Sequence, residues 1–170
     1  MCFPVNLRTL LASLFWVIAV LVVPELGAAE AKNGGAYSIR AVRAYFFFQE
    51  SGRFGSLDLL DPSRVLWNTP IGGGDEGEPS EATLVLVELS GPAFDRNPTG
   101  KLELIARTST RELNRQSTQL SQLFARAQKL MVPFLVLGSG CEPVRLEVRL
   151  SGVVASEQTV VREIPFQCGE

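Results

Sequence analysis

Short segments of alternating hydrophobic and polar residues recur along the chain after residue 36. The clearest is 144–150, in which four aliphatic side chains alternate with three charged ones. Because the side chains of a strand point alternately to opposite faces, this pattern predicts a half-buried β-strand. The segment 101–108 has a similar pattern, and 159–166 follows 144–150 at the spacing of a β-hairpin. These segments together predict antiparallel β-structure.

Other segments are apolar on both faces. Residues 82–89 are nearly continuous in apolar side chains, which predicts a central strand. Residues 37–49 contain four consecutive aromatic side chains, so neither face of this predicted strand is polar. Either both of its faces are covered within the domain, or one face is exposed for a partner. Residues 131–137 form another predicted strand, which includes Pro133. Because proline has no N–H to donate to a neighbouring strand, this strand is predicted to lie at the edge of a sheet.

One segment has helical periodicity. Hydrophobic side chains recur at three- and four-residue spacing in 110–129, and Ser109 followed by Glu112 matches a capping box. This pattern predicts one short amphipathic helix around residues 110–129. The alternative is a loop with one short turn, because Asn114 and Ser117 are indifferent helix formers.

About seven strands, short antiparallel connections and one helix predict a mainly β fold, namely an antiparallel β-sandwich of the immunoglobulin-like or C2-like kind. The stretch 68–81 contains three successive glycines and two prolines, so we expect a long loop without regular structure there. A single domain is predicted over residues 37–170, preceded by a flexible leader at 32–36.

The first 31 residues predict a secretory signal peptide. Arg8 precedes an apolar run at 10–23, which is shorter than the roughly 20 residues that a membrane-spanning helix needs. Small residues follow this run, and we expect cleavage after Ala29 or Ala31. An uncleaved anchor is the alternative, but no cationic cluster follows the run. We therefore expect a periplasmic or secreted protein with no stable membrane anchor after cleavage.

The composition narrows the range of functions. The chain contains no histidine, which excludes Ser-His-Asp and Cys-His nucleophile systems and the usual histidine-based metal sites. Loss of Arg8, Glu25 and Glu30 with residues 1–31 leaves 15 of the 16 basic residues and 16 of the 18 acidic ones. This near-neutral balance argues against nucleic acid or an anionic membrane as a partner. No cofactor is expected, and enzymatic activity is not favoured.

Two cysteines remain after the signal peptide, Cys141 and Cys168, and in an oxidising compartment they predict a disulfide. If Val144 faces Phe166 across the terminal hairpin, the numbers of facing residues sum to 310, whereas the cysteine numbers sum to 309. A bulge at Pro143 supplies the one residue of slack. The predicted bond closes the open end of the hairpin. A structural role is favoured over a redox role because no Cys-x-x-Cys spacing is present.

The candidate ligand or partner surface surrounds the long loop and comprises Trp67, Asn68, Asp75, Glu76 and Glu78. An indole at the mouth of a loop can stack on a sugar ring or on a partner surface, and core packing is the alternative for this side chain.

Carboxylates in the loops also give weak calcium candidates, namely Asp75, Glu76 and Asp95, because calcium prefers oxygen ligands. The Asp-x-Asp-x-Asp-Gly pattern of a dedicated calcium loop is missing, so solvated turns are the favoured interpretation of these side chains, and no metal is assigned. The three glycines of the loop are not followed by Gly-Lys-Ser or Gly-Lys-Thr, which argues against a phosphate site.

The sequence favours an exported, non-enzymatic β domain that binds another envelope or secreted protein, or serves as an accessory module of a larger assembly. Two alternatives come from other classes. One is a carboxylate-based hydrolase, which needs two acids across a substrate, such as Asp58 with Asp61 or Glu76 with Glu78. The other is a calcium-dependent ligand-binding module.

Overall fold

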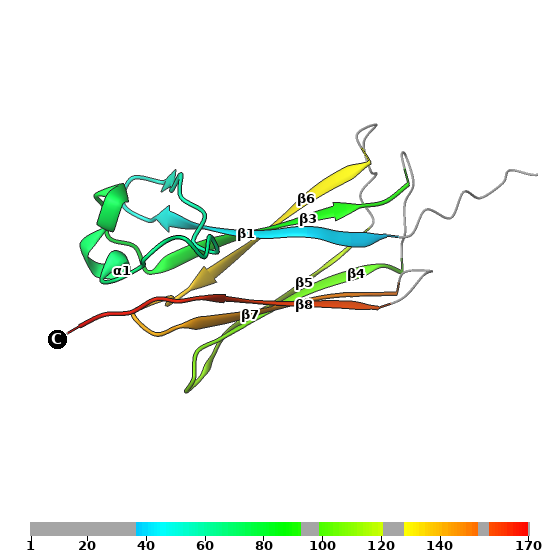
Figure 1. Ribbon diagram of the computed structural model, residues 1–170. Helices are drawn as coiled ribbons and strands as arrows, with labels where there is room; N and C mark the ends of the chain where they lie inside the picture. Colours follow the sequence, from blue (N-terminus) through cyan, green and yellow to red (C-terminus); the bar gives the residue numbers. More distant parts are fainter. Residues whose placement is uncertain (1–36, 93–98, 121–127, 153–156, 170) are drawn as a thin grey trace, which may run out of the picture. The chain divides into compact units, whose positions relative to one another are not determined.

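The computed structural model describes residues 37–92, 99–120, 128–152 and 157–169. The predicted signal peptide and leader lie outside these ranges. Within them the chain forms two antiparallel sheets that pack face to face (Figure 1). The predicted fold class, a mainly β protein built as an antiparallel sandwich, is confirmed.

Each sheet has four strands. The first sheet has the order β2-β1-β3-β6 and the second sheet the order β5-β4-β7-β8. The first sheet consists of β1 (Ser38–Phe48), β2 (Arg53–Phe54), β3 (Ala82–Ser90) and β6 (Lys129–Leu137). The second sheet consists of β4 (Lys101–Arg107), β5 (Glu112–Gln119), β7 (Val144–Ser151) and β8 (Gln158–Ile164).

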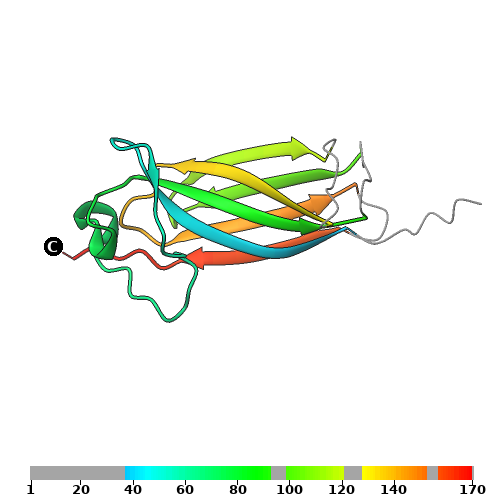
Figure 2. The same cartoon turned by 90° about the horizontal axis from the view of Figure 1, so that it is seen from above.

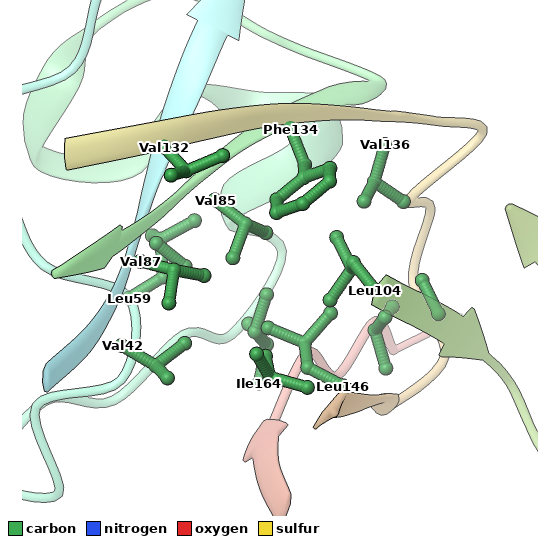
Figure 3. Packing of buried hydrophobic residues seen from close by; sticks show 14 of the residues in the cluster. Val42, Leu59, Val85, Val87, Leu104, Val132, Phe134, Val136, Leu146 and Ile164 are labelled. Carbon is green, nitrogen blue, oxygen red and sulfur yellow. The ribbon is translucent and has the colours of Figure 1, made fainter. Parts of the chain in front are cut away.

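The hydrophobic core lies between the two sheets. Figure 3 shows Val85 and Phe134 of the first sheet directed toward Leu104 and Leu146 of the second. The even-numbered positions of β7 are all buried, as their alternation predicts. Burial of each large aliphatic side chain contributes about 1.5–3 kcal/mol, so this layer supplies the main stabilisation of the domain.

The predicted positions of two strands within their sheet are confirmed. The strand predicted at 82–89 is β3, which lies between β1 and β6. The strand predicted at 131–137 is β6, and it lies at the edge of the first sheet. An edge position accommodates Pro133 because one side of the strand needs no ladder hydrogen bonds.

The helix predicted around residues 110–129 is wrong where the structure describes it, because residues 112–119 form the strand β5. This strand pairs with β4 from end to end. The two strands are joined by a tight turn in which the Thr108 amide donates to the Arg111 carbonyl at 2.9 Å. Weak helix formers and a continuous ladder favour the strand. Residues 121–127 of the predicted helix lie outside the described residues.

The long loop at 68–81 is not entirely irregular. It contains two single helical turns, α1 (Thr69–Gly72) and η1 (Gly74–Glu76). Pro70 lies in the first turn of α1, where its missing N–H and fixed φ are tolerated. Glycines with positive φ end both turns. The expectation of no regular structure in this stretch is therefore corrected.

The register expected for the terminal hairpin is also corrected. Val144 faces Ile164 rather than Phe166, so the numbers of facing residues sum to 308. The ladder ends at Ile164 because Pro165 follows it and cannot donate. Phe166 instead packs in the core, with its ring centroid 5.7 Å from that of Phe46.

The structure joins Cys141 and Cys168 in a disulfide, with their Cα atoms 5.0 Å apart, in agreement with the predicted pairing. The bond lies beyond the end of the β7–β8 ladder, where it ties the segment after β8 to the segment before β7. Both residues are half-buried. In the observed register the sum of the cysteine numbers, 309, is one above the sum of 308 for facing residues, whereas the sequence predicted it one below.

Candidate functional site

The two outer faces of the sandwich differ sharply in polarity. The outer face of the second sheet carries ion pairs, including Glu112 with both Arg107 (3.1 Å) and Arg115 (3.0 Å). Arg115 lowers the pKa of Glu112 through its hydrogen bond, and Arg107 adds to the effect. Of the aliphatic side chains on this face, Ile105 of β4 is only 1% exposed, and Val161 of β8 is 38% exposed. The stems of long neighbouring side chains, such as Arg115 on β5, shield Ile105.

The outer face of the first sheet is apolar. Its side chains alternate along the strands with core residues and therefore point away from the core. We call this surface the apolar face; its members are Tyr45, Phe47, Phe54, Leu84, Leu86, Met131, Pro133, Leu135 and Leu137. Phe54, Met131 and Leu137 are 53%, 43% and 55% exposed, and most of the others are half-buried.

The register of the strands makes the apolar face continuous. Tyr45 of β1 lies opposite Leu84 of β3, which lies opposite Leu135 of β6. At one edge, the rings of Phe47 and Phe54 lie 5.2 Å apart between their centroids. Figure 2 looks onto these three strands, and no other described strand or helix lies over them. The apolar face is therefore an uncovered surface of the part of the chain that the structure describes.

One cation lies within the apolar face. Arg43 is exposed on β1, directly opposite Leu86 of β3. Within the described residues its guanidinium makes no ion pair or hydrogen bond. The neighbouring carboxylate of Glu88 is already engaged, since it lies 3.1 Å from the ammonium of Lys129. Arg43 therefore offers an unpaired positive charge in apolar surroundings.

The free edge of β1 is closed by other parts of the chain. The Ala44 carbonyl accepts from the Leu59 amide at 2.8 Å, and the Ala44 amide donates to Oδ1 of Asp58 at 3.0 Å. At the start of the strand, the Ile39 amide donates to the side-chain oxygen of Gln158 on β8 at 2.9 Å. A partner strand that added to this edge would have to displace these bonds.

Side chains of β5 occupy one backbone acceptor on the free edge of β6. The amide groups of Asn114 and Gln116 both donate to the carbonyl of Leu135, at 2.8 and 3.0 Å. These two polar residues occupy the inward side of β5, where the edge of one sheet meets the edge of the other. The bonds join the two sheets and occupy an acceptor that would otherwise be open to strand addition.

The residues of the sequence-predicted surface have separate roles. Trp67 is 55% exposed and so is not a core residue. Asn68 holds the C-terminal segment: its amide donates to the Gln167 carbonyl at 2.6 Å, and its side-chain oxygen accepts from the Gly169 amide at 3.0 Å. Asp75 is exposed and lies 3.8 Å from Arg64.

Glu76 forms an internal clamp rather than an open site. Its Oε1 accepts the backbone amides of Ser56 (2.6 Å) and Leu57 (2.9 Å), and its side chain is only 6% exposed. Burial alone would raise the pKa of Glu76, but the hydrogen bonds from Leu57 and Ser56 lower it below its ordinary value. Glu78 accepts from the hydroxyl of Ser51 and pairs with Arg53 at 3.4 Å. The structure therefore uses both acids to hold the loops together.

The acids considered for a hydrolase, Asp58 and Asp61, are also held by hydrogen bonds within the loops. Asp58 accepts from backbone amides, and Asp61 accepts from the Ser63 amide and hydroxyl at 2.9 and 2.7 Å. These hydrogen bonds lower the pKa of Asp61. The described residues contain no group of three acids or cysteines placed to hold a metal ion, and Asp95 lies outside them.

Sequence reasoning did not identify the apolar face, although one signal for it was present. The aromatic run of 37–49 left open the choice between a covered face and a face exposed for a partner. The structure places Phe46 and Phe48 in the core and leaves Tyr45 and Phe47 on the outside.

No protein-family model matches the chain, and no curated protein shows significant sequence similarity to it. Among the residues that the structure describes, no helix is long and apolar enough to cross a membrane. The fold and its surfaces define the class: an antiparallel β-sandwich with one ion-paired outer face and one apolar outer face.

Proposed function

We propose that this chain is an exported, non-enzymatic domain that binds another protein through the apolar face. The observation that carries the proposal is the contrast between the two outer faces. On the outer face of the second sheet, Ile105 of β4 is buried beneath the stems of charged side chains. On the outer face of the first sheet, the described elements leave nine apolar side chains uncovered. The core between the sheets is complete without them.

The size of the apolar face supports a role in binding. The longest apolar run of the face, from Met131 to Leu137 on β6, spans seven residues at about 3.3 Å each, and three strands lie about 4.8 Å apart. These spacings give a surface about 23 Å long and 15 Å wide. The largest contiguous apolar patch on a monomeric domain typically measures about 300–600 Å² and often serves in binding. Covering such a patch is favourable by about 25 cal/mol for each Å² removed from water.

The remaining features are consistent with this role. The disulfide between Cys141 and Cys168 supports an oxidising destination such as the periplasm or the exterior. Four of the acids that a hydrolase or a calcium site would use are engaged in hydrogen bonds within the loops, namely Asp58, Asp61, Glu76 and Glu78. Binding is therefore better supported than catalysis.

The test compares two variants of the tagged, full-length chain in the cells that produce it, one for each outer face of the sandwich. Met131→Asp combined with Leu137→Asp places charges at exposed positions of the apolar face. The control is Val161→Asp, an exposed aliphatic position, 38% exposed, on the outer face of the second sheet. We expect the parent and the control to retain the same co-purifying protein and the apolar-face variant to lose it.

Melting temperatures of the three proteins show whether any loss reflects unfolding. The proposal is overturned if the apolar-face variant is folded and still retains every protein that the parent retains. Equal loss from the control variant would also overturn it, because binding would then not be specific to the apolar face.

A further inference from the structure

We infer that the apolar face receives a single amphipathic helix of the partner protein, and that a carboxylate of this helix pairs with Arg43. This inference rests on the proposed function and names the element that occupies the site. Four observations support it: the dimensions of the face, its closed edges, the depth of its side chains and its one unpaired cation.

The dimensions suit one helix better than a second copy of the chain. A helix of about 15 residues is about 23 Å long and 10–12 Å wide, which matches a face about 23 Å by 15 Å. A stable interface between two folded domains buries about 800 Å² on each partner, whereas this face offers about 350 Å² in projection. A helix laid on a sheet is also one of the standard two-layer arrangements.

The closed edges argue against a partner that adds a strand. Strand addition needs a row of free backbone groups at a sheet edge. Loop residues and Gln158 occupy backbone groups along the edge of β1. On the edge of β6, Asn114 and Gln116 occupy the Leu135 carbonyl. Pro133 of the same strand has no N–H to donate. The partner must therefore pack against side chains.

The depth of the side chains argues against a lipid surface. Tyr45, Leu84 and Leu86 are half-buried among their neighbours rather than projecting from the sheet. Insertion into a bilayer needs apolar groups that reach several ångströms beyond the surface. An apolar surface with half-buried side chains at its centre and exposed ones on its edge strands, β2 and β6, instead fits the ridge of side chains that an amphipathic helix presents at i, i+3, i+4 and i+7.

Arg43 defines the charge that the helix must carry. Its guanidinium lies in the same cross-strand row as Leu86 and Pro133, so a helix on the face would cover it. A cation that is covered without a partner is strongly unfavourable, whereas an arginine paired with a carboxylate can form two parallel hydrogen bonds. The nearby Glu88 does not meet this need because Lys129 already pairs with it.

The experiment uses a photo-reactive benzoylphenylalanine at position 86 of the full chain, with the same group at position 161 as the control on the opposite face. Cross-links are induced in the producing cells and mapped by mass spectrometry. We expect position 86 to link to one protein segment in which apolar residues recur at helical spacing around an Asp or Glu. A synthetic peptide of that segment should gain helical circular dichroism when the purified domain is added.

The pairing with Arg43 is tested by charge reversal. Arg43→Glu should weaken binding of this peptide about tenfold or more, and replacement of the peptide's acid by lysine should restore binding to the Arg43→Glu variant. Arg145→Glu, which makes the same change at an exposed arginine on the outer face of the second sheet, should leave binding unchanged.

The outcomes separate this inference from the proposed function. A cross-link from position 86 to lipid, to a second copy of the chain or to an extended segment overturns the helix. Failure of the charge swap to restore binding overturns the pairing with Arg43. Cross-linking at position 86 that is no greater than at position 161 overturns the proposed function itself.

Discussion

The carboxylate of Glu76 and the backbone amide of Leu57 lie 2.9 Å apart, although 19 residues separate them in the sequence. The same oxygen accepts the Ser56 amide at 2.6 Å. One acid therefore binds two successive amides of the segment after β2 and fixes it against the helical turn η1. This clamp orders the end of the sandwich that carries Phe54 of the apolar face.

Replacement of Glu76 by alanine should lower the free energy of unfolding by about 2 kcal/mol, because two backbone amides lose a charged acceptor. Asp75→Ala at the neighbouring position is the matched control, since the Asp75 carboxylate is 81% exposed and, among the described residues, pairs with Arg64 alone. An exposed ion pair contributes less than about 1 kcal/mol. Urea unfolding of both variants measures the difference. Equal effects at the two positions would contradict the clamp.

The clamp should also depend on pH. The pKa of Glu76 is lowered in the folded state, so its contribution to stability is present above the ordinary value of 4.5 and is lost as the pH falls below it. Glu76→Gln cannot titrate at this position. The difference in unfolding free energy between parent and Glu76→Gln should therefore shrink between pH 6 and pH 3. All other acids titrate in both proteins, so their contributions cancel in this difference. A difference in unfolding free energy that stays constant with pH would contradict the clamp.

The sequence 72–74 offers a paired test of backbone geometry. Gly73 has a φ of 75°, and a Cβ at this position would clash with the backbone amide of Glu78. Gly73→Ala should therefore destabilise the domain by about 2–3 kcal/mol. The adjacent Gly72→Ala meets no atom within 4 Å and should be neutral or slightly stabilising within a helical turn. Thermal unfolding that ranks the two variants in the reverse order would contradict this account.

The strands that contribute most to the core could be predicted from the sequence. The buried positions of β7 alternate with charged ones, and β3 is apolar at nearly every position. By contrast, β5 could not be predicted, because its inward positions are polar, including Asn114 and Gln116. Its conformation depends on the ladder with β4 and on side-chain bonds to β6, which no local pattern shows.

The apolar face could be predicted only in part. Hydrophobic residues on both sides of a strand indicate that each side avoids water, but they do not distinguish a covered side from a side that awaits a partner. The Trp67–Glu78 surface was predicted from residue type alone. Residue type does not show that Glu76 and Asn68 use their side-chain oxygens for backbone amides.

Removal of the disulfide should cost much of the stability of the domain. The bond joins residues 27 positions apart, and for a loop of that length the chain-entropy model gives roughly 3.5 kcal/mol. In a domain of this size such a loss corresponds to a fall in melting temperature of about 10 °C. The variant Cys141→Ser with Cys168→Ser tests this by calorimetry, with the reduced parent as the control. A variant as stable as the oxidised parent, or free thiols in the native protein, would contradict a structural role.

The bonds from Asn114 and Gln116 to the Leu135 carbonyl should both stabilise the sandwich and keep the edge of β6 closed. The variant Asn114→Ala with Gln116→Ala removes two donors, and at about 1 kcal/mol for each bond the free energy of unfolding should fall by about 2 kcal/mol. Ser117→Ala, on the exposed side of the same strand, should change it by less than about 0.5 kcal/mol. Because the freed carbonyl lies at an edge beside the apolar face, we also expect the double variant to self-associate. Light scattering across a concentration series measures this tendency under conditions where both variants remain folded. A double variant that stays monomeric and as stable as Ser117→Ala would show that these amides neither join the sheets nor protect the edge.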